Sequence, residues 1–241
     1  MIRKLARLAI LILALSMGSP HVNAATTEAT RSISPQIRTT LEELRELLTG
    51  GNFNAALARA RVVASKADLT PRETYIVQAL IASVLVNLQN YGEAAIALDA
   101  ALATGQVPAA EVPNQIKAVA ALYYNANEFQ KSIEAGERFF SASGTEKDVQ
   151  TLVMIAQAHF HLKHYAKSVK HIRTAITEAD TTGEEVDKRW ILLWIAADHE
   201  TGNISGVAAA LKEFEKRFPN ANYRYEWGRF PLLRDLPPVS L

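Results

Sequence analysis

The chain has 241 residues, with 26 Lys and Arg against 25 Asp and Glu, and it contains no cysteine. A charge balance this close to neutral gives no reason to expect a polyanionic partner such as nucleic acid. The absence of cysteine excludes a disulfide scaffold, a thiol nucleophile and a lipid-bearing cysteine near the N-terminus, so the fold must be held by its apolar core.

The first 24 residues have the pattern of a secretory signal peptide. Arg3, Lys4 and Arg7 precede the apolar run 8–17, and a step of small residues ends at Ala24. The run is shorter than the roughly 20 residues that a membrane-spanning helix needs. We therefore expect cleavage after Ala24, which leaves a soluble chain with 23 basic and 25 acidic residues, periplasmic in a Gram-negative bacterium.

A polar lead-in and then five helix pairs are predicted for the mature chain. Residues 25–34 are polar and lack an apolar period, which is typical of a flexible segment. From residue 35 onward a turn followed by a helix recurs, with separations of 38, 38, 36 and 39 residues. The recurring turn residues are Phe53, Tyr91, Phe129, Tyr165 and Ile204. So regular a period is typical of a stacked helical array.

Each copy also carries a small or compact residue three positions after the turn residue. These positions are Ala56, Ala94, Ser132, Ser168 and Val207. We expect the two helices of a pair to cross closely there, and the turn residue to fill the gap to the next pair.

Local capping signals predict where the first helices begin and end. Ser34 and Thr70 each stand before a proline, and Glu73 completes a capping box with Thr70. The Gly50-Gly51 pair predicts the end of the first helix, because a left-handed turn favours glycine.

These features resemble the tetratricopeptide repeat family. The resemblance is carried by the segments 90–95 (Asn-Tyr-Gly-Glu-Ala-Ala), 127–133 (Asn-Glu-Phe-Gln-Lys-Ser-Ile), 163–169 (Lys-His-Tyr-Ala-Lys-Ser-Val) and 211–219 (Leu-Lys-Glu-Phe-Glu-Lys-Arg-Phe-Pro), and by Ala82, Ala120 and Ala156. It spans residues 35–219 and implies an all-α, right-handed superhelical stack of about five helix-turn-helix repeats. The family period is about 34 residues, so we expect the extra length in the loops 103–111 and 180–184.

In this family the concave surface, lined by first helices, holds a peptide or a partner segment. The corresponding positions are Asn114, Lys117, Tyr124 and Asn125 in the third repeat and Gln150, Gln157, Phe160 and His161 in the fourth. Lys117, Asn125 and Gln157 are expected to grip a carboxylate or a backbone, and Tyr124 and Phe160 an apolar side chain. For Phe160 the alternative is a core position.

Residues 220–241 form a tail of a different kind. Tyr223, Tyr225 and Trp227 alternate, and Phe230 opens a proline-rich end, so we expect an extended cap over the last repeat. The alternative is that Tyr223, Tyr225, Trp227 and Phe230 form an interface with a second copy, which gives a homodimer.

No motif for catalysis or for a cofactor is found. Gly-x-Ser-x-Gly, a phosphate loop and a paired acid site are all lacking, so we predict neither enzyme activity nor a bound cofactor. Trp190 and Trp194 share a helix face at i, i+4, where packing is favoured over ligand stacking.

Four of the six histidines fall in one short stretch. They are His159, His161, His164 and His171, interleaved with the cations Lys163, Lys167, Lys170 and Arg173. On a helix, His159 and His161 point about 200° apart, and no acid or thiol accompanies them. We therefore interpret them as surface histidines on a solvated basic strip and predict no metal site.

Together these observations predict an exported adaptor that binds another cell-envelope protein and performs no turnover. Exported proteins of this shape are similar to tetratricopeptide components associated with TonB-type or Tol-type systems. Two alternatives come from other classes: a self-assembling module that uses the tail, and a binder of a small ligand or cell-wall fragment that stacks on Tyr124, Phe160 and Trp194.

Overall fold

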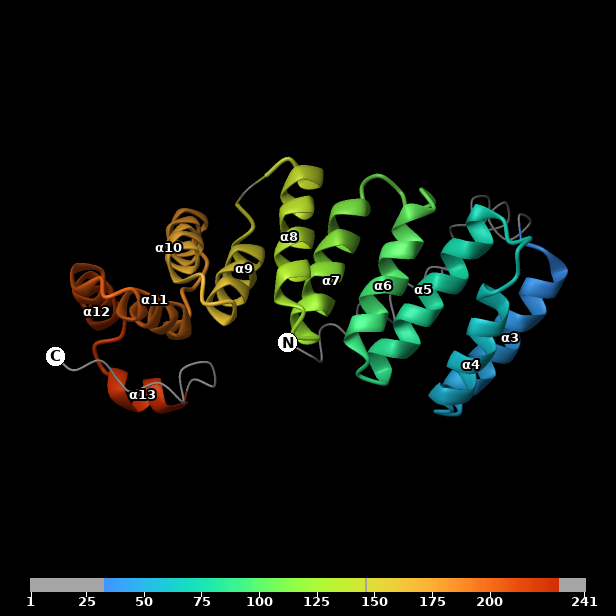
Figure 1. The fold of residues 1–241 in the computed structure, drawn as a ribbon, viewed down its shortest axis with the longest axis horizontal. Coiled ribbons are helices and arrows are strands. Elements are labelled where there is room, and N and C mark those ends of the chain that lie inside the picture. Colours follow the sequence, from blue (N-terminus) through green and yellow to red (C-terminus); the bar gives the residue numbers. More distant parts are fainter. Residues whose placement is uncertain (1–32, 146, 230–241) are drawn as a thin grey trace. The chain divides into compact units, whose positions relative to one another are not determined.

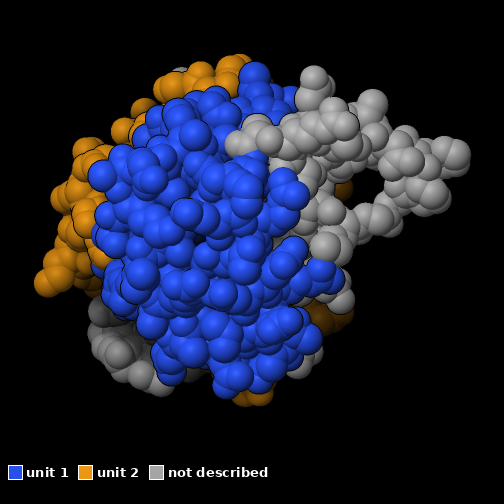
Figure 2. All heavy atoms as spheres, turned by 90° about the vertical axis from the view of Figure 1, so that its right-hand side faces the viewer, with its two compact units in different colours: residues 1–127 blue, residues 128–241 orange. Residues whose placement is uncertain are grey.

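The computed structural model describes residues 33–145 and 147–229. Two compact units divide the chain, residues 1–127 and residues 128–241, which are drawn in blue and orange in Figure 2. The predicted signal peptide, most of the predicted lead-in and Phe230 of the tail lie outside the described residues.

Eleven helices, and no strand, are formed by the described residues. The first unit contains α3 (Pro35–Thr49), α4 (Phe53–Ala64), α5 (Pro71–Asn87), α6 (Tyr91–Ala103) and α7 (Val112–Asn125). The second contains α8 (Phe129–Ser143), α9 (Val149–His161), α10 (Tyr165–Thr182), α11 (Lys188–Glu200), α12 (Ile204–Arg217) and α13 (Tyr223–Arg229). From α3 to α7, and again from α8 to α12, each helix packs against the next along the chain (Figure 1), which confirms the predicted all-α stack.

Within residues 33–145 and 147–229, no helix combines the length and the apolar character that crossing a lipid bilayer requires.

The predicted caps of α3 and α5 are confirmed, and they are joined to each other. Ser34 Oγ accepts from the Ile37 backbone N–H at 3.5 Å, and Thr70 Oγ1 accepts from that of Glu73 at 3.2 Å. Glu73 is buried, and its carboxylate accepts from the backbone N–H of both Thr70 (3.0 Å) and Ser34 (2.9 Å). Hydrogen bonding to Ser34, followed by that to Thr70, lowers the pKa of Glu73 to about 2. One carboxylate therefore ties the starts of two first helices together.

Every repeat uses the same turn between its two helices. The first helix ends four residues before the recurring turn residue, and the second helix begins at that residue. Two residues before it, the backbone is left-handed: Gly51 (φ 72°), Gln89 (59°), Asn127 (59°), Lys163 (59°) and Gly202 (71°). The next N–H closes the first helix by bonding to a carbonyl five residues back, as from Asn90 to Leu85 at 2.9 Å. The turn is thus defined by the backbone, because glycine occupies the left-handed position in only two of its five copies.

The small residues after the turns lie inside the fold, and the close helix crossing expected there stays a prediction. Ala56, Ala94, Ser132, Ser168 and Val207 are all buried. The turn residues also reach the next pair: the Phe129 ring stacks on His161 at 4.1 Å, and Tyr165 hydrogen-bonds Glu200. Ile204, in the last pair, is 82% exposed. Packing therefore explains the repeat motif without any catalytic role.

Two expectations about length and tail are corrected. Tyr223–Arg229 forms the short helix α13 and is not extended. Asn222 starts this helix by accepting from the backbone N–H of Arg224 at 3.0 Å. The alternating aromatic pattern, which is typical of an extended segment, outweighed this single capping signal in the prediction. The extra residues after 180 prolong α10 to Thr182, where Gly183 (φ 75°) ends it, while residues 104–111 form a loop as expected.

Candidate functional site

The four predicted groove residues of the first unit lie on α7. Asn114 is exposed, and Lys117, Tyr124 and Asn125 are half-buried. Lys117, Tyr124 and Asn125 lie 3, 10 and 11 residues after Asn114, which places all four along one face of the helix. Burial raises the pKa of Tyr124 to about 12, so its hydroxyl remains protonated and able to donate.

Two further residues on α5 belong with this face and were missed in the sequence. The Arg72 guanidinium lies 5.6 Å from the centre of the Tyr75 ring, in a cation–π contact. Burial, and then the carboxylate of Glu111 at the start of α7, raises the pKa of Tyr75. Tyr75 therefore lies within electrostatic reach of the start of α7, and we count Arg72 and Tyr75 as candidate residues beside the α7 face. The available signal was an aromatic and a cation at the polar edge of the α5 apolar stripe.

The predicted groove residues of the second unit lie on α9, with one correction. Gln150 and His161 are exposed, and Gln157 is half-buried. Phe160 is only 7% exposed and packs edge-on against Tyr165, with ring centres 5.2 Å apart. Phe160 is thus a core residue, the alternative considered above, because it lies one turn from inward-facing Ala156. The eight predicted residues divide four and four between the two units, and each face is a candidate surface by itself.

His159 corrects the interpretation of the histidines as surface residues. It is 5% exposed, and its Nδ1 has no hydrogen-bond partner within the described part of the chain. Its ring centre lies 5.4 Å from that of His171 and 5.7 Å from that of His164. Burial, followed by the positive potential of His171, Lys167 and His164, lowers the pKa of His159 to about 4, so the side chain is neutral at pH 7.

The neighbouring histidines do not make a metal site of this cluster. Burial, and then Lys170 and Lys167, also lowers the pKa of His171. In the described ranges, no group of three or more His, Cys, Asp or Glu side chains is arranged to hold a metal ion.

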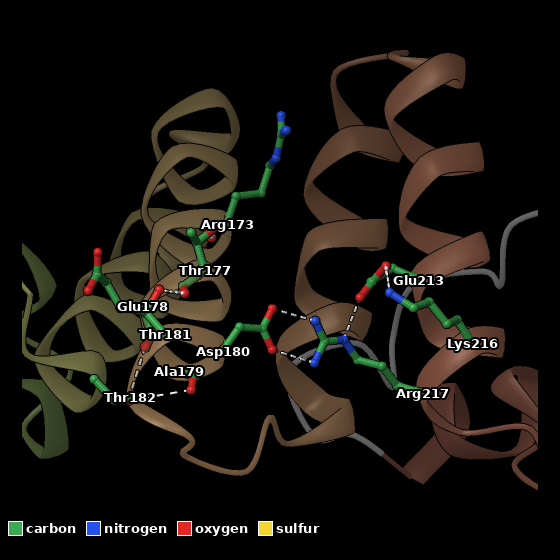
Figure 3. A network of polar contacts seen from close by, with 10 residues as sticks. All are labelled: Arg173, Thr177, Glu178, Ala179, Asp180, Thr181, Thr182, Glu213, Lys216 and Arg217. Atoms are coloured by element: carbon green, nitrogen blue, oxygen red, sulfur yellow. Dashed lines mark hydrogen bonds and ion pairs between the residues drawn. The ribbon is translucent and has the colours of Figure 1, made fainter.

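The basic strip is confirmed as an exposed surface of the α9–α10 turn and α10. Residues 149–177 contain no Asp or Glu, and Lys163, Lys167, Lys170 and Arg173 are all exposed. Arg173 lies over the Trp194 ring at 5.1 Å and points away from the acidic end of α10 (Figure 3).

Comparisons with known proteins show a similarity of fold and no similarity of sequence family. No protein-family model matches the chain, and no curated protein sequence matches it. A crystal structure of the MamA protein superposes with a TM-score of 0.54 at 12% identity, over 85% of this chain and 98% of that one. MamA 41-end from Desulfovibrio magneticus RS-1 gives 0.53 at 12% identity, over 79% and 99%. The fold is tetratricopeptide-like.

One polar network in the core of this tetratricopeptide-like chain explains the tryptophan pair. Trp190 and Trp194 are buried in the hydrophobic core formed by α9 to α12. Trp194 Nε1 donates to Asp198 Oδ2 at 2.6 Å, and Asn203 Nδ2 donates to Asp198 Oδ1 at 2.8 Å. Packing is therefore the role of both tryptophans, and the buried Asp198 carboxylate is fully engaged between α11 and the turn to α12.

Proposed function

We propose that the protein is a scaffold that binds a segment of another protein on the faces of its first helices. The observation that carries this proposal is the tetratricopeptide-like stack itself, which leaves half-buried polar and aromatic side chains on one face of α7. Lys117 supplies a cation, Asn125 an amide and Tyr124 a protonated hydroxyl, which together suit a carboxylate or an extended backbone.

The face of α9 has the same chemistry in weaker form. Gln150 and Gln157 supply amides, and His161 supplies a flat ring already stacked on Phe129. Because amides donate and accept, such a surface suits the backbone of an extended segment. Binding through either face needs no reacting group, so the proposed activity is recognition without turnover.

We place the protein in the periplasm, on the strength of the signal-peptide pattern in residues 1–24. The proposed partner is a cell-envelope protein complex, of which TonB-type and Tol-type transport systems are the expected kind. The resemblance of an exported repeat protein of this size to components of such systems supports this choice.

The test is crosslinking and pull-down of the tagged protein from its native envelope, with mass spectrometry of the captured proteins. Lys117→Glu is expected to lose one transport or assembly complex that the wild type recovers. Lys212→Glu, the same charge change at an exposed lysine of α12, is the matched control and should still recover this complex. Circular dichroism and melting should be unchanged in both, and equal capture by both variants would remove the α7 face from consideration.

Self-assembly through the tail is the second candidate, because α13 leaves Tyr225 60% exposed. Truncation after Asn220 should then convert a dimer to a monomer in analytical ultracentrifugation. A monomeric wild type would exclude this candidate. The small-ligand alternative is weakened, since Phe160 and Trp194, two of its three proposed stacking platforms, are core residues.

A further inference from the structure

The charges on α10 run against its helix dipole. Lys167 and Lys170 lie in its first two turns and Lys163 just before it, whereas Glu178 and Asp180 lie near its end. The N-terminus of a helix carries a partial positive charge, so cations there and anions at the C-terminus are both unfavourable. His164, the N-cap residue, provides no side-chain cap. This arrangement lowers the stability of α10, so a reason other than helix stability is needed.

The acids of α10 have partners inside the fold, which offset their unfavourable position. Glu178 pairs with Lys147 at 3.2 Å. Asp180 pairs with both Nη atoms of Arg217 at 2.7 and 2.8 Å, and Arg217 also pairs with Glu213 (Figure 3). These contacts join α10 to its surroundings at its C-terminal end.

The lysines at the N-terminal end of α10, unlike the acids at its C-terminal end, have no ion-pair partner among the described residues. Within residues 33–145 and 147–229, no ion pair joins Lys163, Lys167 or Lys170 to a carboxylate. Glu200 of α11 is engaged with the Tyr165 hydroxyl and lies 3.8 Å from His199 Nδ1. Among the described residues, no carboxylate pairs with these lysines to offset their positive charge.

Beneath the lysines lies the buried His159, whose Nδ1 lacks a partner. Buried polar atoms are almost always hydrogen-bonded, and an unpaired one is costly. The charged and titratable groups that act on His159 come from the α9–α10 turn and α10: His164, Lys167 and His171, all basic. The neighbouring helices contribute no acid to it: Phe129 of α8 stacks on His161, and Glu200 of α11 is hydrogen-bonded to Tyr165. We define the histidine–lysine strip as Lys163, His164, Lys167, Lys170 and His171, with His159 beneath it.

We propose that the histidine–lysine strip binds an acidic segment of another protein, a run of Asp and Glu side chains. The strip runs from the α9–α10 turn onto α10, where Lys167 and Lys170, three residues apart, share one face of the helix and can meet successive carboxylates of a bound segment. A lipid surface fits less well. The large apolar side chains that the described residues expose are Val62, Ile96, Ile204 and Tyr225, and α9 and α10 carry none of them.

Binding of carboxylates on the strip favours the protonated form of the histidines below it. Affinity is therefore expected to rise as the pH falls from 7.5 to about 5.5, with uptake of protons on binding. This site is on a second helix and does not depend on the proposed scaffold function. Lys117→Glu, which tests the α7 face, should leave it unchanged, so the two proposals fail separately.

The experiment measures fluorescence anisotropy of a labelled peptide with alternating Glu and Gly, against the purified protein at low salt. An otherwise identical peptide with Gln in place of Glu is the ligand control. Lys167→Glu/Lys170→Glu is expected to weaken binding of the Glu peptide about tenfold or more. Lys66→Glu/Lys212→Glu, the same charge change at two exposed lysines outside the strip, is the matched control and should bind like the wild type.

Equal losses in the two double variants, or equal binding of the Gln peptide, would overturn the proposal. Binding of anionic phosphatidylserine vesicles through the same lysines, without binding of the Glu peptide, would replace it with a lipid surface. His159→Leu should remove part of the tightening at low pH and keep the affinity at pH 7.5. His171→Gln gives a second, half-buried test of the same effect, and unchanged pH dependence in both would refute the role of the histidines.

Discussion

The α9–α10 and α11–α12 turns have the same backbone conformation but differ in the hydrogen bonding of a buried polar side chain. In each, the residue before the second helix donates its N–H to a carbonyl five residues back: His164 to His159 at 2.8 Å, and Asn203 to Asp198 at 2.9 Å. The side chain of Asp198 is held by Trp194 and Asn203, whereas His159 Nδ1 has no partner among the described residues. The same framework thus carries a hydrogen-bonded buried side chain in one turn and, in the other, a buried histidine whose Nδ1 is unpaired beneath exposed lysines.

The two turns also differ in the residue at the left-handed backbone position. The left-handed position is Gly202 in one turn and Lys163 in the other. A side chain in this conformation costs free energy that glycine avoids. Lys163 and His159 therefore make the α9–α10 turn the less stable of the two, which agrees with a binding role for the strip.

The largest effect is expected from breaking the satisfied turn. Asp198→Ala should lower the free energy of unfolding by about 3 kcal/mol, because the buried Trp194 Nε1–H loses its acceptor and Asn203 loses the carboxylate that holds the turn. All three tryptophans lie in the second unit, so tryptophan fluorescence during urea unfolding reports on this unit. Asp180→Ala, which removes a more exposed ion pair, should cost less than about 1 kcal/mol. Similar losses in the two variants would contradict the assigned role of Asp198.

Acid should weaken the unsatisfied turn. The pKa of His159 is about 4 in the folded protein against an ordinary value of 6.5, so its contribution is complete above pH 6.5 and is lost as the pH falls toward 4. The loss approaches about 3 kcal/mol at the lower limit. It is measured by urea unfolding at a series of pH values.

His159→Leu should remove this part of the pH dependence. Glu73 affects stability only at lower pH, because its pKa of about 2 keeps its contribution to stability complete above pH 4.5. It also lies in the first unit, whereas His159 lies in the second. A His159→Leu profile that matches the wild type between pH 7 and pH 5 would show that His159 is not the titrating group.

A methyl group added at Gly206 should disturb the α11–α12 turn by colliding with the side chains that hydrogen-bond there. A Cβ on Gly206 would collide with the Asp198 carboxylate and the Asn203 amide, both fixed by hydrogen bonds. Gly206→Ala should therefore cost about 2 kcal/mol in urea unfolding. At Gly136 the Cβ would meet the end of the Ile155 side chain at 2.8 Å, which can rotate, so Gly136→Ala should cost less. The reverse order would show that the carboxylate can shift.

The smallest effect sharpens the comparison at the left-handed position. Lys163→Gly should raise the free energy of unfolding by about 0.5 to 1 kcal/mol, and Gly202→Ala should lower it by about 1 kcal/mol. Both are measured in the same urea titration. Lys167→Gly removes a lysine from the interior of α10 and should be destabilising by about 1 kcal/mol, which controls for the loss of charge. A destabilising Lys163→Gly would mean that the lysine side chain stabilises the turn by contacts of its own.

The capping box at Thr70 and the start of every second helix were predictable because their signals are local. A capping side chain and its target are separated by three residues, and the turn residue recurs with the period of the stack. The short helix α13 was missed because a single N-cap, Asn222, competes with a strong alternating aromatic pattern. Of the candidate site, the α7 face was predicted, whereas the inclusion of Arg72 and Tyr75 of α5 depended on helix pairing.

The stack of helix pairs could be predicted from the sequence because periodicity, small residues and turn residues act over one repeat. The burial of Phe160, the burial of His159 beneath cations and the pairing of Asp180 with Arg217 could be known only from the contacts between helices. The reason is physical. A helix period specifies which residues share a face, but burial and charge neutralisation depend on which other helix covers that face, and that contact joins residues far apart in the chain.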